Sequence, residues 1–185
     1  MGTRCLTHFI NEQGNDIVTM YRQYDGYLEG HGKDLAEFLA PFYVTNGISF
    51  GEKRKTANGM SCLTAQAIAH FKNESGAGGI YLEPANTKDC WEEYNYTVYL
   101  DTRAVGRPTE KGLTDEGVLK IKVENVYSLE IIFDGTAQEL LTKLDEPLPD
   151  LSITWNTEVC EKCDSEFKHY LHAKNHYAKH HLITI

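Results

Sequence analysis

Hydrophobic and polar residues alternate along several short stretches of this chain. Alternation with a period of two over Tyr94 to Leu100 and over Val118 to Val126 is typical of strands with one solvated face. Apolar runs bordered by turn-forming residues indicate further strands at Cys5 to Ile10, Ile17 to Tyr24, Ile80 to Leu82 and Leu129 to Phe133. The pattern therefore predicts a fold that is rich in short strands.

Three other stretches have the apolar spacing of helices. Apolar residues recur at intervals of three and four from Asp34 to Tyr43 and again from Met60 to Lys72. A third helix is expected to run to Leu144, with Thr136 as its N-cap candidate. Phe50 to Asn58 and Arg103 to Gly117 are expected to be loops, because the first is charged and the second contains proline and several glycines.

These elements predict an α+β fold with a mostly antiparallel sheet and about three helices, because the helices are segregated from the strands along the chain. The length of 185 residues allows one sizeable core and a small appendage. We expect an α+β domain at 1–144, a linker or docking strand at 145–157, which is acidic and proline-rich, and a small C-terminal ββα-type zinc module at 158–185.

The charge is acidic, with 18 Lys and Arg against 27 Asp and Glu and a formal net charge of −9. This balance is opposite to the usual signature of a nucleic-acid-binding protein. Cys5, Cys62 and Cys90 have no close-spaced partner, and the sequence has neither an apolar stretch of signal length nor an apolar run of membrane-spanning length. We therefore expect a cytoplasmic protein in a reducing compartment and no membrane partner.

The C-terminal stretch contains four potential metal ligands at regular spacing. Two residues separate Cys160 from Cys163, twelve separate Cys163 from His176, and three separate His176 from His180. This is the spacing of a tetrahedral Zn2+ site, in which a tight turn presents two thiolates and a helix presents two imidazoles one turn apart. His181 also satisfies the spacing of the fourth ligand. The alternative is a Cys- and His-rich tail that binds no metal.

The stretch CEKCDSEFKHYLHAKNHYAKHH resembles the Cys2His2 (C2H2) zinc finger family over roughly the last 28 residues. Phe167 falls four residues after Cys163, where such a finger needs an aromatic side chain. The family usually has leucine three residues before its first ligand histidine, and this chain has Ala173 there. The resemblance implies that bound zinc supplies the folding energy of the segment, which is too short to bury a core of its own.

The resemblance leaves the role of the finger open. If the finger docked on DNA as its family does, His169, His172 and Asn175 would face the bases. One finger covers only about three base pairs, and the acidic remainder of the chain would repel phosphates. We therefore expect a protein partner or a structural role first and a nucleic-acid partner second. A catalytic zinc is disfavoured because four protein ligands leave no open position.

The most unusual run of the first domain extends from Arg22 to His31 and is rich in aromatic, charged and glycine residues. Glycines allow backbone N–H groups to approach a ligand, and a helix N-terminus attracts anions. The run therefore predicts a small-molecule site, for a nucleotide or another anion, formed by Arg22, Tyr24, Asp25, Tyr27 and His31. The simpler interpretation is that its glycines form the turns that join a strand to a helix.

This run, together with Ala57-Asn58-Gly59, Ala69 to Lys72, Gly78 to Leu82 and Asp89-Cys90, resembles a group of uncharacterised proteins of bacteria and their phages. The likeness covers about the first 135 residues and implies a phage protein that acts in the cytoplasm of a bacterial host, with no activity attached.

Other polar residues give weaker signals. His70 is expected at the edge of the core, His8 on an exposed face, and Glu92 and Glu93 on a solvated acidic face. We expect a non-catalytic zinc-binding protein that acts through macromolecular interaction; the alternatives are a small-molecule-binding protein or hydrolase with a pocket around Arg22 to His31, and a DNA-binding regulator.

Overall fold

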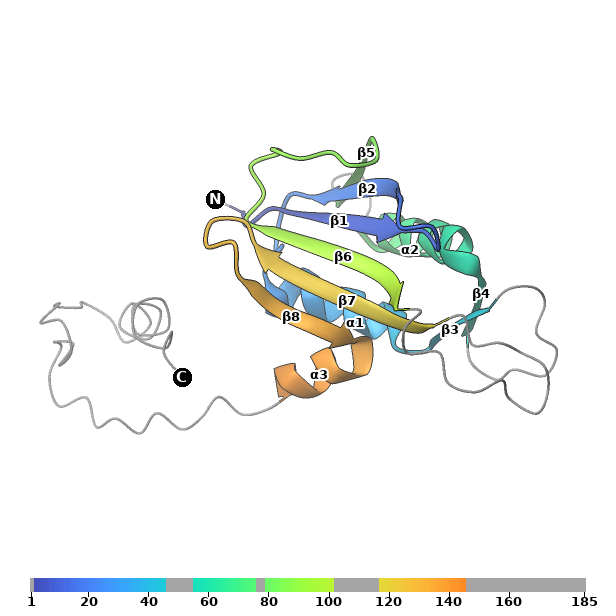
Figure 1. Cartoon of the computed structure of the whole chain (residues 1–185). Helices are drawn as coiled ribbons and strands as arrows, with labels where there is room; N and C mark the ends of the chain where they lie inside the picture. Colours follow the sequence, from blue (N-terminus) through green and yellow to red (C-terminus); the bar gives the residue numbers. More distant parts are fainter. Residues whose placement is uncertain (1, 46–54, 76–78, 102–116, 146–185) are drawn as a thin grey trace, which may run out of the picture. The chain divides into compact units, whose positions relative to one another are not determined.

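The computed structural model describes residues 2–45, 55–75, 79–101 and 117–145 (Figure 1). These residues form an α+β fold with three α-helices, as the sequence predicts. The elements in chain order are β1 Cys5–Ile10, β2 Asp16–Arg22, the π-helix η1 Leu28–Gly32, α1 Lys33–Leu39, β3 Phe42–Thr45, β4 Lys55–Asn58, α2 Gly59–Ser75, β5 Ile80–Glu83, β6 Tyr94–Asp101, β7 Val118–Asn125, β8 Ile131–Thr136 and α3 Ala137–Asp145.

The main sheet has six strands in the order β5-β2-β1-β6-β7-β8. Its neighbouring strands are antiparallel except for β1 and β6, which are parallel. β5 and β6 follow each other in the chain but are separated in the sheet by β2 and β1, so the residues that connect them, 84–93, cross these two strands. We call residues 84–93 the crossover segment. β3 and β4 form a separate, parallel two-stranded sheet.

One face of the main sheet carries the hydrophobic core. Residues that alternate along the central strands and share this face are completely buried, including Phe9, Met20, Tyr96, Val98, Ile121 and Val123. Helices α1 and α2 lie against this side of the sheet (Figure 1), and both contribute buried residues to the same cluster. The other face carries mostly polar side chains, with His8 of β1 flanked by Thr19 of β2 and Thr97 of β6.

The helix expected to extend to Tyr43 ends at Leu39, and Phe42 and Tyr43 belong to strand β3. The prediction was wrong because Pro41, whose ring and missing N–H end a helix, overrides the apolar spacing. The prediction that Lys55 to Asn58 is a loop was also wrong. These polar residues form β4, in which Ala57 is buried, and their strand conformation comes from pairing with β3.

The ends of other elements are set by local interactions. The turn before β8 is longer than expected. Leu129, the predicted start of the strand, lies in the turn with a φ of +58°, and the strand begins at Ile131. Thr136 caps α3 as predicted: Glu139 N–H donates to Thr136 Oγ1 over 3.2 Å, and Thr136 N–H donates to Glu139 Oε2 over 2.7 Å.

Helix α2 is capped from a distance. Met60 N–H donates to Glu12 Oε1 over 2.6 Å, although Glu12 lies in the turn between β1 and β2. A carboxylate at this end of a helix satisfies a backbone donor that has no partner within the helix and interacts favourably with the helix dipole. Gly59 precedes this donor with a φ of +75°, a conformation that glycine adopts without strain.

No helix among residues 2–45, 55–75, 79–101 and 117–145 is long and apolar enough to cross a bilayer. The predicted zinc finger at 158–185 lies outside the described residues, as do the predicted linker beyond Asp145 and nearly all of the predicted loop from Arg103 to Gly117.

Candidate functional site

The residues of the predicted small-molecule site, Arg22 to His31, form the connection between β2 and α1. After Arg22 the chain turns at Asp25, which has a φ of +56°, and passes through η1 into α1. Two backbone hydrogen bonds close the turn: Gly26 N–H donates to Thr3 O over 3.0 Å, and His31 N–H donates to Asp25 O over 2.7 Å. A Cβ atom on Gly26 would lie 2.8 Å from the carbonyl carbon of Arg4, so this close approach requires glycine.

His31 is completely buried and uses both ring nitrogens. Arg22 Nη1 lies 3.1 Å from His31 Nδ1, and Thr7 Oγ1 lies 2.7 Å from His31 Nε2. A guanidinium group can only donate, so Nδ1 must be the acceptor. The proton of the neutral imidazole is therefore on Nε2, which donates to Thr7 Oγ1. This arrangement fixes one tautomer and leaves neither nitrogen of His31 to accept a proton from a substrate.

The surroundings of His31 also hold it neutral. The Tyr96 ring meets the imidazole edge to face at 4.9 Å between centroids, and the Phe71 ring lies at 5.6 Å. Burial, and secondarily the charge of Arg22, lower the pKa of His31 from 6.5 to about 3. Tyr96 Oη donates to Gly26 O over 2.9 Å, which ties the same turn to the central strand β6.

Arg22 is also hydrogen-bonded to two residues that follow it in the chain, Tyr24 and Asp34. Its Nη1 also donates to Asp34 Oδ2 over 2.7 Å, and its Nε donates to Tyr24 O over 3.0 Å. The Arg22 side chain is 21% exposed and that of Asp34 is 46% exposed. The carboxylate of Asp34 therefore already neutralises the positive charge of Arg22, which an anionic ligand would need.

The structure brings together only some of the predicted site residues. Arg22 and His31 are in contact, whereas the side chains of Tyr24, Asp25 and Tyr27 are exposed. Within the described residues, no hydrogen bond or ring contact joins the Tyr24 or Tyr27 side chain to His31. The geometry favours the simpler interpretation, in which the glycines of this stretch form the turns that join β2 to α1.

His70 lies at the core edge, as expected. Its ring stacks on Phe38 at 4.8 Å and meets Phe71 at 5.0 Å, and the residue is half-buried. Cys5, Cys62 and Cys90 are free cysteines, and burial raises the pKa of the Cys5 thiol far above its ordinary value.

A second histidine network was missed from the sequence. His8 was expected to be exposed, but its side chain is only 14% exposed and its Nδ1 lies 2.7 Å from Asp16 Oδ2. Asp16 is 2% exposed in its side chain, and the same oxygen accepts from Asn86 N–H over 2.8 Å and from Thr19 Oγ1 over 3.2 Å. The expectation failed because the crossover segment approaches this face of the sheet.

In the His8–Asp16 pair a buried carboxylate contacts one ring nitrogen, as in many histidine sites, where this contact fixes the orientation of the ring. The signal for it in the sequence was the turn from Asn11 to Asn15, which makes the two strands a hairpin and therefore neighbours. Thr19 Oγ1 lies 3.2 Å from His8 Nδ1, the same ring nitrogen that contacts Asp16 Oδ2.

Glu92 also differs from its prediction. It is 5% exposed instead of solvated: it belongs to the end of the crossover segment, and its Oε1 accepts from Asp89 N–H of the same segment over 3.3 Å. Glu93 is half-buried, and its N–H and O extend the sheet through hydrogen bonds to Arg4 O and Val126 N–H, each 2.9 Å.

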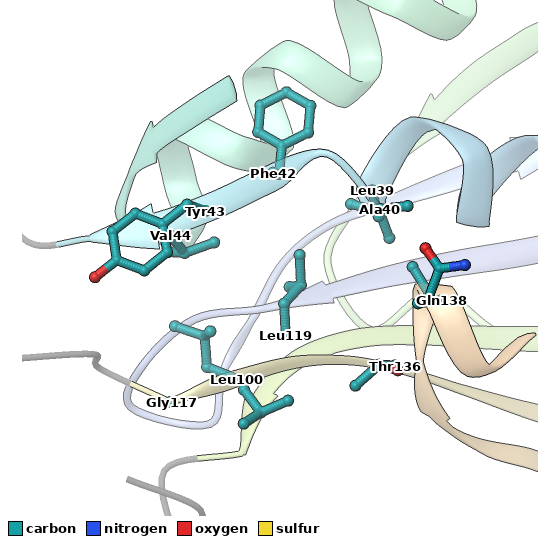
Figure 2. A pocket seen from close by; sticks show the side chains of 12 residues that line it. Leu39, Ala40, Phe42, Tyr43, Val44, Leu100, Gly117, Leu119, Thr136 and Gln138 are labelled. Atoms are coloured by element: carbon teal, nitrogen blue, oxygen red, sulfur yellow. The ribbon is translucent and has the colours of Figure 1, made fainter. Parts of the chain in front are cut away.

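A groove of about 260 Å³ lies at the end of the main sheet where β6 ends and β7 begins. Figure 2 shows apolar side chains of β3, β6 and β7 on its walls, with Thr136 and Gln138 at the start of α3. The residues that line it include Leu39, Phe42, Val44, Leu100, Leu119 and Tyr43. Most of the residues that line it are apolar, and Tyr43, Thr136 and Gln138 are the polar side chains among them.

The described part of the chain contains no group of three or more His, Cys, Asp or Glu side chains that could hold a metal ion. The predicted zinc ligands Cys160, Cys163, His176, His180 and His181 lie outside it, as do His169, His172 and Asn175. In comparisons with known proteins, no protein-family model, no curated protein and no solved structure matches this chain.

Proposed function

We propose that this protein is a non-catalytic, cytoplasmic zinc-binding protein that acts by contacting another macromolecule. The single observation that carries the proposal is the ligand spacing at Cys160, Cys163, His176 and His180. Four protein ligands close the coordination sphere of zinc, so the metal has a structural role and shapes a surface. His181 is the alternative fourth ligand.

The arrangement of the first domain supports a binding role more than an enzymatic one. An enzyme site around Arg22 to His31 would need a histidine with a free nitrogen in a solvent-accessible pocket. His31 has both nitrogens hydrogen-bonded and is completely buried, and Arg22 is paired with Asp34. The small-molecule-binding or hydrolase alternative therefore has no geometric support at this position.

A protein partner agrees with the distribution of charge. From Glu158 to the end, Lys162, Lys168, Lys174 and Lys179 balance Glu158, Glu161, Asp164 and Glu166, so the formal charge of −9 belongs to the rest of the chain. An acidic body repels nucleic-acid phosphates. A DNA-binding regulator that reads bases through His169, His172 and Asn175 is the second candidate, and the resemblance of the finger to its family supports it.

The resemblance of residues 1–135 to proteins of bacteria and their phages suggests where such a partner would be found. The protein would act on a component of a bacterial host, in the host cytoplasm. An acidic surface combined with a zinc module suits recognition of a host protein that itself binds nucleic acid, because the acidic surface then competes for the same basic groups.

Metal analysis of the purified full-length chain tests the proposal directly. The native protein should contain about one zinc per chain, and Cys160→Ser should lose it, whereas the matched control Cys90→Ser should retain it. A purified native protein without bound zinc would contradict the proposal. A mobility-shift titration of DNA against salt concentration separates the two candidates, since a DNA-binding regulator must bind at moderate salt with a salt-dependent affinity.

A further inference from the structure

Exposed aromatic and aliphatic side chains gather at one end of the main sheet. Those at this end are Tyr24, Tyr27, Trp91, Tyr127 and Leu129 in the loops and Ile131 at the start of β8, and we call this set the aromatic end. Trp91 is 78% exposed, Tyr127 is 74% exposed and Leu129 is 84% exposed. A group of large apolar side chains that are exposed together on a folded domain is typical of an interaction surface.

Backbone hydrogen bonds join the loops that carry these residues. The turn at Gly26 bonds to Thr3 over 3.0 Å, Arg4 bonds to Glu93 over 2.9 Å, and Glu93 bonds to Val126 over 2.9 Å. Figure 1 shows the starts of β1 and β6 and the β7–β8 hairpin at this same end of the sheet. The aromatic end is therefore a set of neighbouring loops on one rigid sheet, although its residues are distant in sequence.

The most exposed aromatic ring is held in place by a basic side chain. Arg4 Cζ lies 5.7 Å from the centroid of the Trp91 ring, a cation–π contact, while most of Trp91 is in solvent. Trp91 has a φ of +59°, a conformation that a bulky residue rarely adopts and that surrounding contacts must maintain. A tryptophan presented to solvent in this way is the type of residue that dominates binding energy at protein interfaces.

The charges of the same loops are mainly negative. The exposed carboxylates are Asp25, Glu29, Asp89 and Glu130, Glu93 is half-buried, and the cations are Arg4 and Lys88. Burial, and next the charges of Glu29 and Glu93, raise the pKa of Tyr94, which begins β6 at this end. The aromatic end therefore combines electron-rich rings with a negative potential.

We propose that the aromatic end binds a lysine- and arginine-rich segment of a partner protein. Ring faces attract ammonium and guanidinium groups, and the surrounding carboxylates complement the same charge. A nucleic acid would meet like charge here, and an uncharged apolar partner would leave the carboxylates unpaired. This inference rests on the proposed interaction role, but it places the contact in the first domain and not in the predicted finger.

Fluorescence anisotropy with a labelled lysine-rich peptide tests the inference on the full-length protein. We expect saturable binding that weakens with salt, and no binding of an otherwise identical peptide whose lysines are acetylated. Trp91→Ala and Tyr127→Ser should each weaken binding by about tenfold or more. Leu82→Ser, which removes a 53% exposed side chain from β5, is the matched control and should bind the peptide as the native protein does.

Several results would overturn the inference. These are the absence of saturable binding to the lysine-rich peptide, equal binding of the acetylated peptide, or unchanged binding by the folded Trp91→Ala and Tyr127→Ser variants. Binding of single-stranded DNA through the same residues, or a native dimer in sedimentation that Trp91→Ala makes monomeric, would assign the surface to another occupant.

Zinc measured on the same samples separates this inference from the proposed function. A zinc-loaded protein that does not bind the peptide contradicts the aromatic end alone. Native protein without zinc that binds the peptide contradicts the finger alone. Cys160→Ser should bind the peptide with unchanged affinity, because the aromatic end belongs to the first domain.

Discussion

Arg22 Nη1 lies 3.1 Å from His31 Nδ1, and this contact fixes the tautomer of a completely buried histidine. Because guanidinium only donates, the imidazole is neutral and its remaining proton is directed to Thr7. The aromatic rings of Phe71 and Tyr96 exclude water from the same group. His31, from the stretch that looks most like a ligand site in the sequence, is thus a buried residue with consequences for stability.

His31 should make the protein sensitive to mild acid. Its folded pKa of about 3 lies below the unfolded value of 6.5, so the unfolded chain binds more protons and stability falls as the pH drops from 6.5 toward 3. Between pH 7 and pH 5 this group alone should lower the free energy of unfolding by about 2 kcal/mol. Urea denaturation at both pH values measures the loss, which should be absent in His31→Gln.

The His31→Gln variant should also be less stable at pH 7 by about 1–3 kcal/mol, because it disturbs buried hydrogen bonds. His70→Gln is the matched control, because it removes a histidine that is only half-buried. Identical changes with pH in the native protein and in His31→Gln would contradict the assignment of the acid sensitivity to His31.

Asp16→Ala should destabilise the domain by about 1–3 kcal/mol. Oδ2 of Asp16 accepts from a ring nitrogen of His8, from Thr19 Oγ1 and from the backbone N–H of Asn86, so the change leaves several donors without a partner. Denaturation measures the free energy, and hydrogen exchange should show faster exchange at Asn86. Asp134→Ala, at an exposed carboxylate, is the control and should have a smaller effect.

Glu12→Ala should weaken the start of α2, because Glu12 Oε1 accepts from Met60 N–H over 2.6 Å. The expected loss in the free energy of unfolding is about 0.5–1 kcal/mol, in the lower part of the range for capping interactions because Glu12 is exposed. Gln13→Ala is the neighbouring control. Equal stability of Glu12→Ala and Gln13→Ala in denaturant would show that this cap contributes nothing.

The fourth zinc ligand can be assigned by substitution. If His180 completes the site, His180→Ala should weaken zinc binding strongly and His181→Ala should leave it nearly unchanged. Competition with a chromogenic chelator measures the affinity of each variant. The reverse ranking would assign His181, and equal, native affinity in both variants would show that either histidine can complete the site.

The sequence alone predicts the elements whose formation depends on neighbours in the chain. Alternation identified β6 and β7, apolar spacing identified α2, and the Thr136 and Glu139 pair marked the start of α3, because each signal acts over a few residues. Pro41 likewise carries local information that ends α1 before β3.

Only the tertiary structure decides the properties that depend on distant segments. β4 is a strand because β3 pairs with it, and His8 is enclosed because the crossover segment brings Asn86 to Asp16. His31 is neutral because Phe71 and Tyr96 surround it. Burial and pairing are set by which segments the sheet order places together, and no short window of sequence contains that information.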